Sequence, residues 1–129
     1  MAFIDIHGHY AWDIDDVMPS LEDAKKALEK AKNNRISTIV ATPHVVSGKH
    51  TLKDLEVIKD RIHDLKELAR VYNIEVLEGC ELFLNHDYLE ALEQNIFIPI
   101  ENTHYLLVEF DVRKELGLSL IHISEPTRR

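Results

Sequence analysis

Two histidines separated by a single residue stand near the start of the chain, at positions 7 and 9. If this stretch is a strand, His7 and His9 point to the same face, together with Asp5, because side chains alternate along a strand. Neutral imidazole is a common metal ligand, so the spacing favours metal binding. Three carboxylates follow within one loop's reach: Asp13, Asp15 and Asp16. A pair of solvated histidines is the competing interpretation, since short motifs occur by chance, and ligands further along the chain must decide.

Further potential ligands stand at or near the C-terminal ends of three later segments with strand character. These are residues 36–44, 74–83 and 105–110, which carry His44, Glu81 and Glu109. Successive ligands are separated by close to the ~30 residues of one strand–helix–strand unit. Equivalent positions of successive parallel units meet at one rim, and in parallel barrels the working site lies at the C-terminal rim. The sequence therefore predicts that these side chains converge with the two N-terminal histidines.

Three histidines and two to four carboxylates at one rim are more than a single ion requires. They suit two or three cations bridged by a carboxylate, which would activate water and clamp a phosphoryl group. Nitrogen and oxygen ligands without thiolate are compatible with Mn²⁺, Zn²⁺ or Fe. Glu81 and Glu109 stand among apolar neighbours, where an unpaired carboxylate is costly. Metal coordination therefore explains these two residues better than solvation does.

Two amphipathic helices separate the first three predicted strands. Ser20 with Asp23, and Thr51 with Asp54, resemble capping boxes with the shorter acid and predict where each helix begins. In the second helix, apolar residues recur at steps of three and four, which predicts one buried stripe: Leu55, Ile58, Ile62, Leu65, Ala69 and Tyr72. A short helix is expected over residues 85–95, and no periodic pattern follows residue 110.

The alternation of strands and helices defines the expected fold class. It predicts parallel strands with helices packed outside them, in an open α/β sheet or part of a barrel. The 129 residues are the size of one domain, and the 45% hydrophobic and 29% charged residues are typical of a globular protein. The formal net charge of −8 argues against nucleic acid as a partner, because phosphate backbones are bound by clustered Lys and Arg.

Cysteine usage and hydropathy bear on location. Cys80 is the only cysteine, so no internal disulfide can form, and no basic region followed by an apolar run of signal-peptide length opens the chain. We therefore expect a cytoplasmic location. No apolar stretch approaches the ~20 residues that span a bilayer, so we expect no membrane insertion. The sequence does not indicate an oligomeric state.

Five motifs in order resemble the PHP (polymerase and histidinol phosphatase) superfamily. They are His7-Gly-His9, Asp15-Asp16, the Ala-Thr-Pro-His run at 41–44, the Gly-Cys-Glu at 79–81 and the Leu-Val-Glu-Phe at 107–110. Within that superfamily, the chain most resembles the manganese-dependent tyrosine-protein phosphatases of bacterial capsule and exopolysaccharide operons. The similarity runs from residue 3 to about residue 111.

The resemblance implies a metal site, a fold and a cofactor. By position, it makes metal ligands of His7, His9, Asp16, His44, Glu81 and Glu109, with Glu81 as a bridge. The implied cofactor is Mn²⁺, in two or three ions. The implied fold is an incomplete PHP-type barrel, with only the first four strand units of a distorted TIM-like barrel that has seven strands in the family. The family usually has Gly after the Asp-Asp pair, where this chain has Val17, so we expect an altered loop around Asp16.

The function implied by the resemblance is that of a protein-tyrosine phosphatase. Its substrate would be a phosphotyrosine protein, most naturally a bacterial tyrosine kinase that regulates capsule or exopolysaccharide synthesis. Two alternatives stay open. One is a histidinol-phosphate phosphatase with the same metals, which relative turnover of the two substrates would separate. The other is a catalytically dead metal-binding module, which would hold metal without hydrolysis.

The remaining histidines and Cys80 are excluded from the predicted site. His50, His63, His86 and His104 lack the register of the strand ends. Cysteine-dependent tyrosine phosphatases use Cys-x-x-x-x-x-Arg, but His86 stands six residues after Cys80, so Cys80 is expected to be a small buried apolar residue. Tyr10 and Trp12 are candidates for a pocket that takes an aromatic phosphoester, or for the core.

The predicted domain boundary lies after residue 111. Residues 1–111 are interpreted as the N-terminal part of a PHP phosphoesterase domain, and residues 112–129 as a tail of non-native appearance. From about residue 118 the tail resembles a translated sequencing adapter, so His122 is not expected to be a ligand. We expect the chain as written to be inactive, since four strand units cannot close a barrel. The exposed edge of the fourth strand is expected to favour association.

Overall fold

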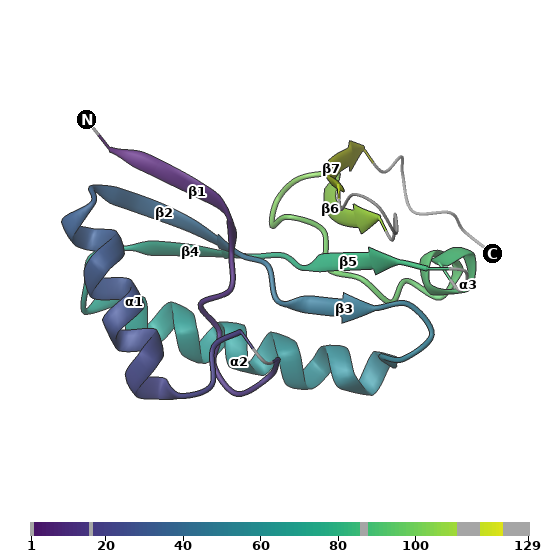
Figure 1. Cartoon of the computed structure of the whole chain (residues 1–129), viewed down its shortest axis with the longest axis horizontal. Helices are drawn as coiled ribbons and strands as arrows, with labels where there is room; N and C mark the ends of the chain where they lie inside the picture. Colours follow the sequence, from purple (N-terminus) through teal and green to yellow (C-terminus); the bar gives the residue numbers. More distant parts are fainter. Residues whose placement is uncertain (1, 16, 86–87, 111–116, 123–129) are drawn as a thin grey trace.

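The computed structural model describes residues 2–15, 17–85, 88–110 and 117–122. Strands and helices alternate along most of this part, as predicted (Figure 1). The elements in chain order are β1 (Phe3–Gly8), α1 (Leu21–Asn33), β2 (Ile36–Ala41), β3 (His44–Val46), α2 (Leu52–Arg70), β4 (Glu75–Glu78), β5 (Glu81–Leu84), α3 (Tyr88–Glu93), β6 (Tyr105–Phe110) and β7 (Gly117–His122). A mixed α/β fold is therefore confirmed.

The strands form two sheets, in the orders β1-β2-β4 and β3-β5-β6-β7. All pairs up to β5–β6 are parallel, as predicted. Residues 36–44 and 74–83 were each expected to form one strand, but each pair of short strands is separated by two residues, Thr42-Pro43 and Gly79-Cys80. Proline has no N–H to donate to a ladder. The described residues contain two sheets and no closed barrel.

Hydrogen bonds at the two breaks hold the sheets together. Thr42 donates its N–H to the Gly8 carbonyl at 2.9 Å, and its hydroxyl accepts from the Gly8 N–H at 3.0 Å. The Pro43 carbonyl accepts from the Glu81 N–H at 2.9 Å. The ladder hydrogen bonds that the breaks remove are thus partly replaced, as buried backbone groups require. The new strands begin at His44 and Glu81, so each break sets the position of a predicted ligand.

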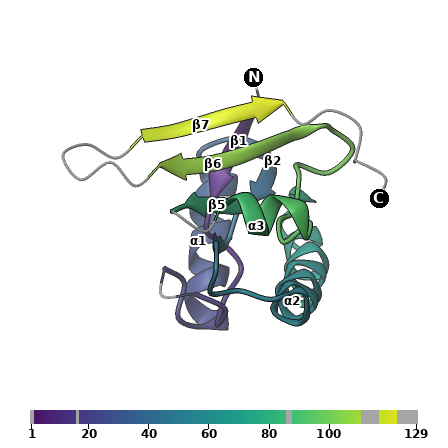
Figure 2. The same cartoon turned by 90° about the vertical axis from the view of Figure 1, so that its right-hand side faces the viewer.

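The last strand departs from the sequence-based expectation. No element was predicted after residue 110, but β7 pairs antiparallel with β6 from Phe110↔Gly117 to Tyr105↔His122 (Figure 2). The expectation that the edge of the fourth predicted strand is exposed is therefore wrong. The long-range pairing partner decides such a short strand, and local patterning does not show it. The predicted boundary after residue 111 falls outside the described residues and stays a prediction.

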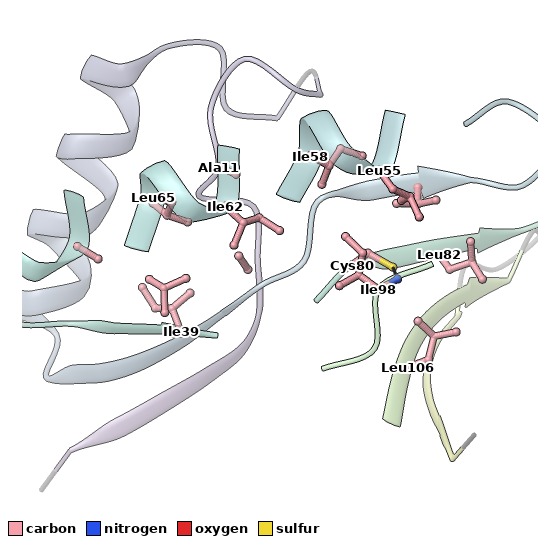
Figure 3. Packing of buried hydrophobic residues seen from close by; sticks show 14 of the residues in the cluster. Ala11, Ile39, Leu55, Ile58, Ile62, Leu65, Cys80, Leu82, Ile98 and Leu106 are labelled. Atoms are coloured by element: carbon pink, nitrogen blue, oxygen red, sulfur yellow. Dashed lines mark hydrogen bonds between the residues drawn. The ribbon is translucent and has the colours of Figure 1, made fainter. Parts of the chain in front are cut away.

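Both long helices begin at their predicted caps and lie on the same side of the strands (Figure 1). The Ser20 hydroxyl accepts from the Asp23 N–H, and Thr51 with Asp54 forms a complete capping box. The predicted stripe of α2 is buried at five positions: Leu55, Ile58, Ile62, Leu65 and Ala69. Figure 3 shows Leu65 and Ile58 of this stripe on the side of α2 that faces Ile39 of β2 and Cys80. This packing fixes the strand ends that carry the predicted ligands.

Cys80 lies in the core, as predicted. It is 0% exposed, and its sulfur accepts a hydrogen bond from the Ile98 N–H at 3.2 Å. Ile98 belongs to the apolar run 96–100, whose three isoleucines are buried. None of the helices in the described part of the chain has the length and hydropathy that a membrane span requires.

Candidate metal centre

Four of the predicted ligands lie in or beside three strands that belong to the two sheets: β1, β3 and β5. His7 lies in β1 and His9 follows its last residue. His44 and Glu81 are the first residues of β3 and β5 and are direct partners in the parallel ladder. The bond between the Thr42 hydroxyl and the Gly8 N–H brings the end of β1 beside the start of β3. The strand breaks therefore place three imidazoles around one carboxylate.

Glu81 is the centre of this arrangement and is only 2% exposed. Its Oε1 lies 3.0 Å from the Nε2 of His9 and 3.0 Å from the Nε2 of His44. Its Oε2 lies 3.4 Å from the Nε2 of His7. The Nε2 atoms of His7 and His9 are 3.2 Å apart. All three imidazoles thus direct the same ring nitrogen toward one buried carboxylate.

Asp15 contacts the opposite side of two of these rings. Its Oδ2 lies 3.6 Å from the Nδ1 of His9 and 3.6 Å from the Nδ1 of His44, and it accepts from the His44 N–H at 3.2 Å. Its Oδ1 accepts from the Val17 N–H at 3.0 Å. A carboxylate at the second imidazole nitrogen is the usual means of fixing the tautomer and orientation of a metal-binding histidine.

Of the Asp15-Asp16 pair, the predicted ligand set included Asp16 and not Asp15. Asp16 lies outside the described residues, so its predicted role stays a prediction. The only sequence signal for Asp15 was its membership of the same Asp-Asp pair. Which carboxylate turns inward depends on the loop conformation, where Asp13 has a left-handed φ of 58°. Val17, which replaces the usual Gly, is 45% exposed and is not among the described residues with positive φ.

The charges of the centre shift two pKa values. Burial lowers the pKa of His9, but the nearby carboxylates of Asp15 and Glu81 outweigh burial, and the net shift raises it. Burial raises the pKa of Asp15, but His9 and the N–H groups of Val17 and His44 outweigh this, and the pKa falls to about 2. Asp15 is therefore anionic at neutral pH, and the centre attracts positive charge.

Three overlapping groups of side chains have potential ligand atoms within 4.8 Å of one another. The groups are His7 with His9 and Glu81, His9 with Asp15 and His44, and His44 with Glu81 and Glu109. Glu109 lies in β6 and is half-buried, and its ladder partner is Phe83, two residues beyond Glu81. The structure thus brings together five of the six predicted ligands and adds Asp15.

The observed distances fit a divalent cation. The Nε2 atoms of His7 and His9 lie 3.2 Å apart, so one divalent cation would be able to take both as ligands. Without a cation, these two nitrogens and the Glu81 carboxylate would have to share protons. The Nδ1 of His9 is buried, with no hydrogen-bond partner within range among the described residues. The donors are nitrogen and oxygen only, which suits Mn²⁺ and related ions.

The other candidate residues lie outside these groups. Asp5, which was expected on the same face as His7 and His9, accepts from the His7 backbone N–H at 3.0 Å and from the Tyr10 hydroxyl at 3.3 Å. Burial and Asp5 raise the pKa of Tyr10 to about 12. Tyr10 and Trp12 both pack against the core. In the described part of the chain, the excluded histidines belong to none of the ligand groups: His50, His63, His104 and His122. His86 lies outside the described residues.

Comparison with known proteins places the chain in a family. A CapC protein of Staphylococcus aureus is 28% identical over 109 residues, which are 83% of this chain and 42% of the relative. Tyrosine-protein phosphatase CpsB of Streptococcus pneumoniae is 30% identical over 111 residues, which are 84% of this chain and 45% of the relative. CpsB of Streptococcus agalactiae is 28% identical over 116 residues, 85% of this chain and 46% of the relative.

The chain thus spans less than half the length of these relatives. The family model described as capsular polysaccharide synthesis, CpsB/CapC, matches residues 3–122, and so includes every strand of both sheets. The chain therefore belongs to the CpsB/CapC family of capsular polysaccharide synthesis.

Proposed function

We propose that the cluster around Glu81 holds two or three divalent cations, with Mn²⁺ as the native metal. The observation that carries this proposal is the buried Glu81 carboxylate, which three imidazole Nε2 atoms approach within 3.4 Å. A carboxylate buried to this degree is costly unless positive charge faces it, and bound cations would supply that charge. The proposed ligands are His7, His9, Asp16, His44, Glu81 and Glu109, and Asp15 holds His9 and His44 in orientation.

The proposed activity is hydrolysis of phosphotyrosine in a protein substrate, such as a bacterial tyrosine kinase involved in capsule synthesis. The streptococcal relatives are named tyrosine-protein phosphatases, which supports this substrate class. Bound divalent cations supply activated water and neutralise charge on the phosphoryl oxygens. The side chains of this chain bind and orient. Glu81 joins the neighbouring ligand groups, while Asp15 keeps the imidazoles of His9 and His44 aligned.

The mechanism that we propose uses no cysteine nucleophile. Cys80 is next to Glu81 in sequence, but its sulfur is fully buried and burial raises its pKa to about 12. A thiol of this kind is neutral at physiological pH and has no access to substrate. The proposed hydrolysis therefore depends on cations held by the imidazole and carboxylate cluster, and not on Cys80.

The proposed setting is a cytoplasmic phosphatase with a PHP-type barrel, of which this chain supplies the first four strand units. The parallel order of β1 to β6 and the position of the ligands at the strand breaks support this fold. A complete centre then needs ligands beyond those described, and the 129-residue chain alone should bind metal but turn over little substrate.

Mn²⁺ binding to the 129-residue chain, measured by isothermal titration calorimetry, tests the metal centre. We expect Glu81→Gln to lose most of the binding, because it removes the anionic member common to two ligand groups. Glu75→Gln is the matched control, since Glu75 is exposed on β4. A folded wild-type chain that takes up no Mn²⁺ would contradict the proposed centre.

Activity is tested with a phosphotyrosine peptide, with this chain and Streptococcus pneumoniae CpsB assayed side by side. We expect the relative to lose hydrolysis in a chelator and to recover it with Mn²⁺, and the 129-residue chain to show little turnover. Histidinol phosphate serves as the competing substrate. Turnover of histidinol phosphate that is faster than turnover of the phosphotyrosine peptide would contradict the proposed activity. Hydrolysis of the peptide that survives complete metal removal would also contradict it.

A further inference from the structure

A single arginine of α2 contacts the loop that carries Asp15. The Arg61 Cζ lies 4.9 Å from the centroid of the Trp12 ring, in a cation–π contact. Its Nη2 lies 4.0 Å from the Oδ2 of Asp13. Arg61 stands between Ile58 and Ile62, which are 3% and 1% exposed and anchor this part of α2 in the core. The guanidinium therefore reaches the loop from a fixed support.

The backbone of the loop is held at Asp13 as well. Ala11 is 2% exposed, so the chain enters the loop from the core. Asp13 has a left-handed φ of 58°, and its N–H donates to the Met18 carbonyl at 2.9 Å. This bond closes the segment that contains Asp15. A non-glycine residue in this conformation is held by its surroundings at a cost, and Arg61 contacts both Trp12 and Asp13.

The Arg61 side chain has one unfavourable feature beside its favourable contacts. Its Nε is buried and has no hydrogen-bond partner in the described part of the chain. An unpartnered buried N–H is unfavourable, and an apolar side chain of similar length would avoid it. Asp64 is 3.5 Å from the Nη1 and holds the other edge of the guanidinium. The arrangement orients the cation toward Trp12 and Asp13.

We propose that Arg61 is a positioning residue for the metal centre. By stacking on Trp12 and pairing with Asp13, it holds the loop so that Asp15 stays within reach of the Nδ1 atoms of His9 and His44. This inference rests on the proposed function, because it assigns to Arg61 the geometry of the same centre. The competing explanation is packing alone, in which the aliphatic part of Arg61 covers apolar surface.

The first test needs no metal. Trp12 is the only tryptophan, so tryptophan fluorescence reports the surroundings of this ring, which Arg61 contacts. In Arg61→Met, which keeps an apolar stem, we expect Trp12 to become more accessible to acrylamide, and the ring ¹⁵N resonances of His9 and His44 to shift in NMR spectra. Arg70→Met is the control, because Arg70 is an exposed residue of the same helix that pairs only with Glu67 among the described residues. Unchanged histidine resonances in Arg61→Met would overturn the proposal, whatever the metal content.

The second test measures Mn²⁺ affinity. We expect Arg61→Met to weaken binding roughly 10-fold or more, the usual effect of losing support for a metal-binding histidine. Arg61→Lys, which keeps the charge, should retain part of the Mn²⁺ affinity, and Arg70→Met should bind Mn²⁺ as tightly as wild type. When Asp15→Asn is already present, Arg61→Met should lower the Mn²⁺ affinity much less. The reason is that Arg61 is proposed to act only through the contact of Asp15 with His9 and His44.

The outcomes separate this inference from the metal proposal. If wild type binds no Mn²⁺, the metal proposal fails, and the histidine resonances still decide the role of Arg61. If wild type binds Mn²⁺ and Arg61→Met binds it equally well, Arg61 only packs. If Arg61→Met does not fold, Asp13→Asn replaces it, because Asp13 is exposed and the change removes only the ion pair. Equal Mn²⁺ affinity and unshifted histidine resonances in Asp13→Asn would then overturn the inference.

Discussion

At the scale of single residues, the strongest feature is the contrast between the adjacent Cys80 and Glu81. Both are buried, but Cys80 points among apolar residues while Glu81 meets three imidazoles. Side chains of neighbouring residues leave an extended chain on opposite faces. Cys80 therefore packs in the core, while the next residue, Glu81, lies in the candidate metal centre.

The Cys80 thiol should be inert in the native protein. Burial raises its pKa to about 12, so thiolate is scarce at pH 8. We expect no reaction with a chromogenic disulfide reagent until the chain is unfolded in urea, followed by one equivalent of product. Cys80→Ala should bind Mn²⁺ like wild type. Rapid native labelling would show that the residue is accessible, contrary to the structure.

Gly8 should tolerate no side chain without a cost to the end of β1. A Cβ at this position would lie 2.5 Å from the Cε2 of Tyr10, so the Tyr10 ring would have to move away from Asp5. We expect Gly8→Ala to lower the free energy of unfolding by about 1–3 kcal/mol, the usual cost of overpacking. Urea unfolding measures this change in free energy. The control is Ala2→Gly, at an exposed residue beside β1. Gly48→Ala cannot serve as the control, because the φ of Gly48 is 80° and alanine would be strained there.

At the scale of elements, the loop after Ile100 is joined to both α2 and β4 through one carboxylate. Glu101 accepts from the Lys66 ammonium group and from the Glu78 N–H at 2.9 Å. Its backbone N–H in turn donates to the Glu78 carbonyl at 2.8 Å. This contact holds the connection between α3 and β6 at the end of β4.

The Glu101 contact should make stability depend on acid. Burial raises the pKa of Glu101, but Lys66 and the Glu78 N–H outweigh it, so the pKa in the folded state is lowered. The contribution is therefore present above the unfolded pKa of about 4.3 and is lost as pH falls through the folded pKa. We expect Glu101→Gln to cost about 1 kcal/mol at pH 7, a value discounted for partial exposure.

Urea unfolding at pH 7 and at pH 3 measures this effect. The difference in the free energy of unfolding between wild type and Glu101→Gln should be smaller at pH 3 than at pH 7. At pH 3 the wild-type carboxylate begins to take up a proton. Glu75→Gln, at an exposed position, should show no such dependence. A constant difference at both pH values would assign the effect to packing and not to charge.

At the scale of the whole molecule, the candidate centre joins both sheets. His7 comes from β1 of one sheet, and His44, Glu81 and Glu109 come from the strands of the other. An ion bound by both sheets stabilises the folded state over the unfolded state. We expect Mn²⁺ at about 100 times its dissociation constant to add about 2.7 kcal/mol to the free energy of unfolding. Calorimetry with Mn²⁺ and then with a chelator measures this, and Glu81→Gln should show no gain.

One of the edge strands of the two sheets is β1, which is paired on one side only in the described part of the chain. Ile4 and Ile6 are 64% and 52% exposed there. Unpaired edges with apolar side chains favour strand addition. We expect concentration-dependent association of the 129-residue chain in sedimentation experiments, reduced in Ile4→Lys. Val71→Lys, at an exposed residue after α2, should associate like wild type, and equal behaviour of both variants would exclude β1 as the contact.

The sequence alone determined the features that depend on local periodicity. The two long helices follow from their caps and from the three- and four-residue steps of α2. The shared face of His7 and His9 follows from the alternation of a strand. The positions of His44, Glu81 and Glu109 followed from the regular spacing of strand–helix units, and the structure places them together, although their role as ligands stays a prediction.

The tertiary structure decided what depends on contacts between distant segments. The breaks at Thr42-Pro43 and Gly79-Cys80 exist because neighbouring strands satisfy the backbone groups there. The strand β7 exists because β6 pairs with it. Asp15 turns toward His44, and Arg61 meets Trp12, through approaches between segments far apart in the chain. No local pattern encodes such approaches, because their free energy comes from groups that only the folded chain brings within a few ångströms of each other.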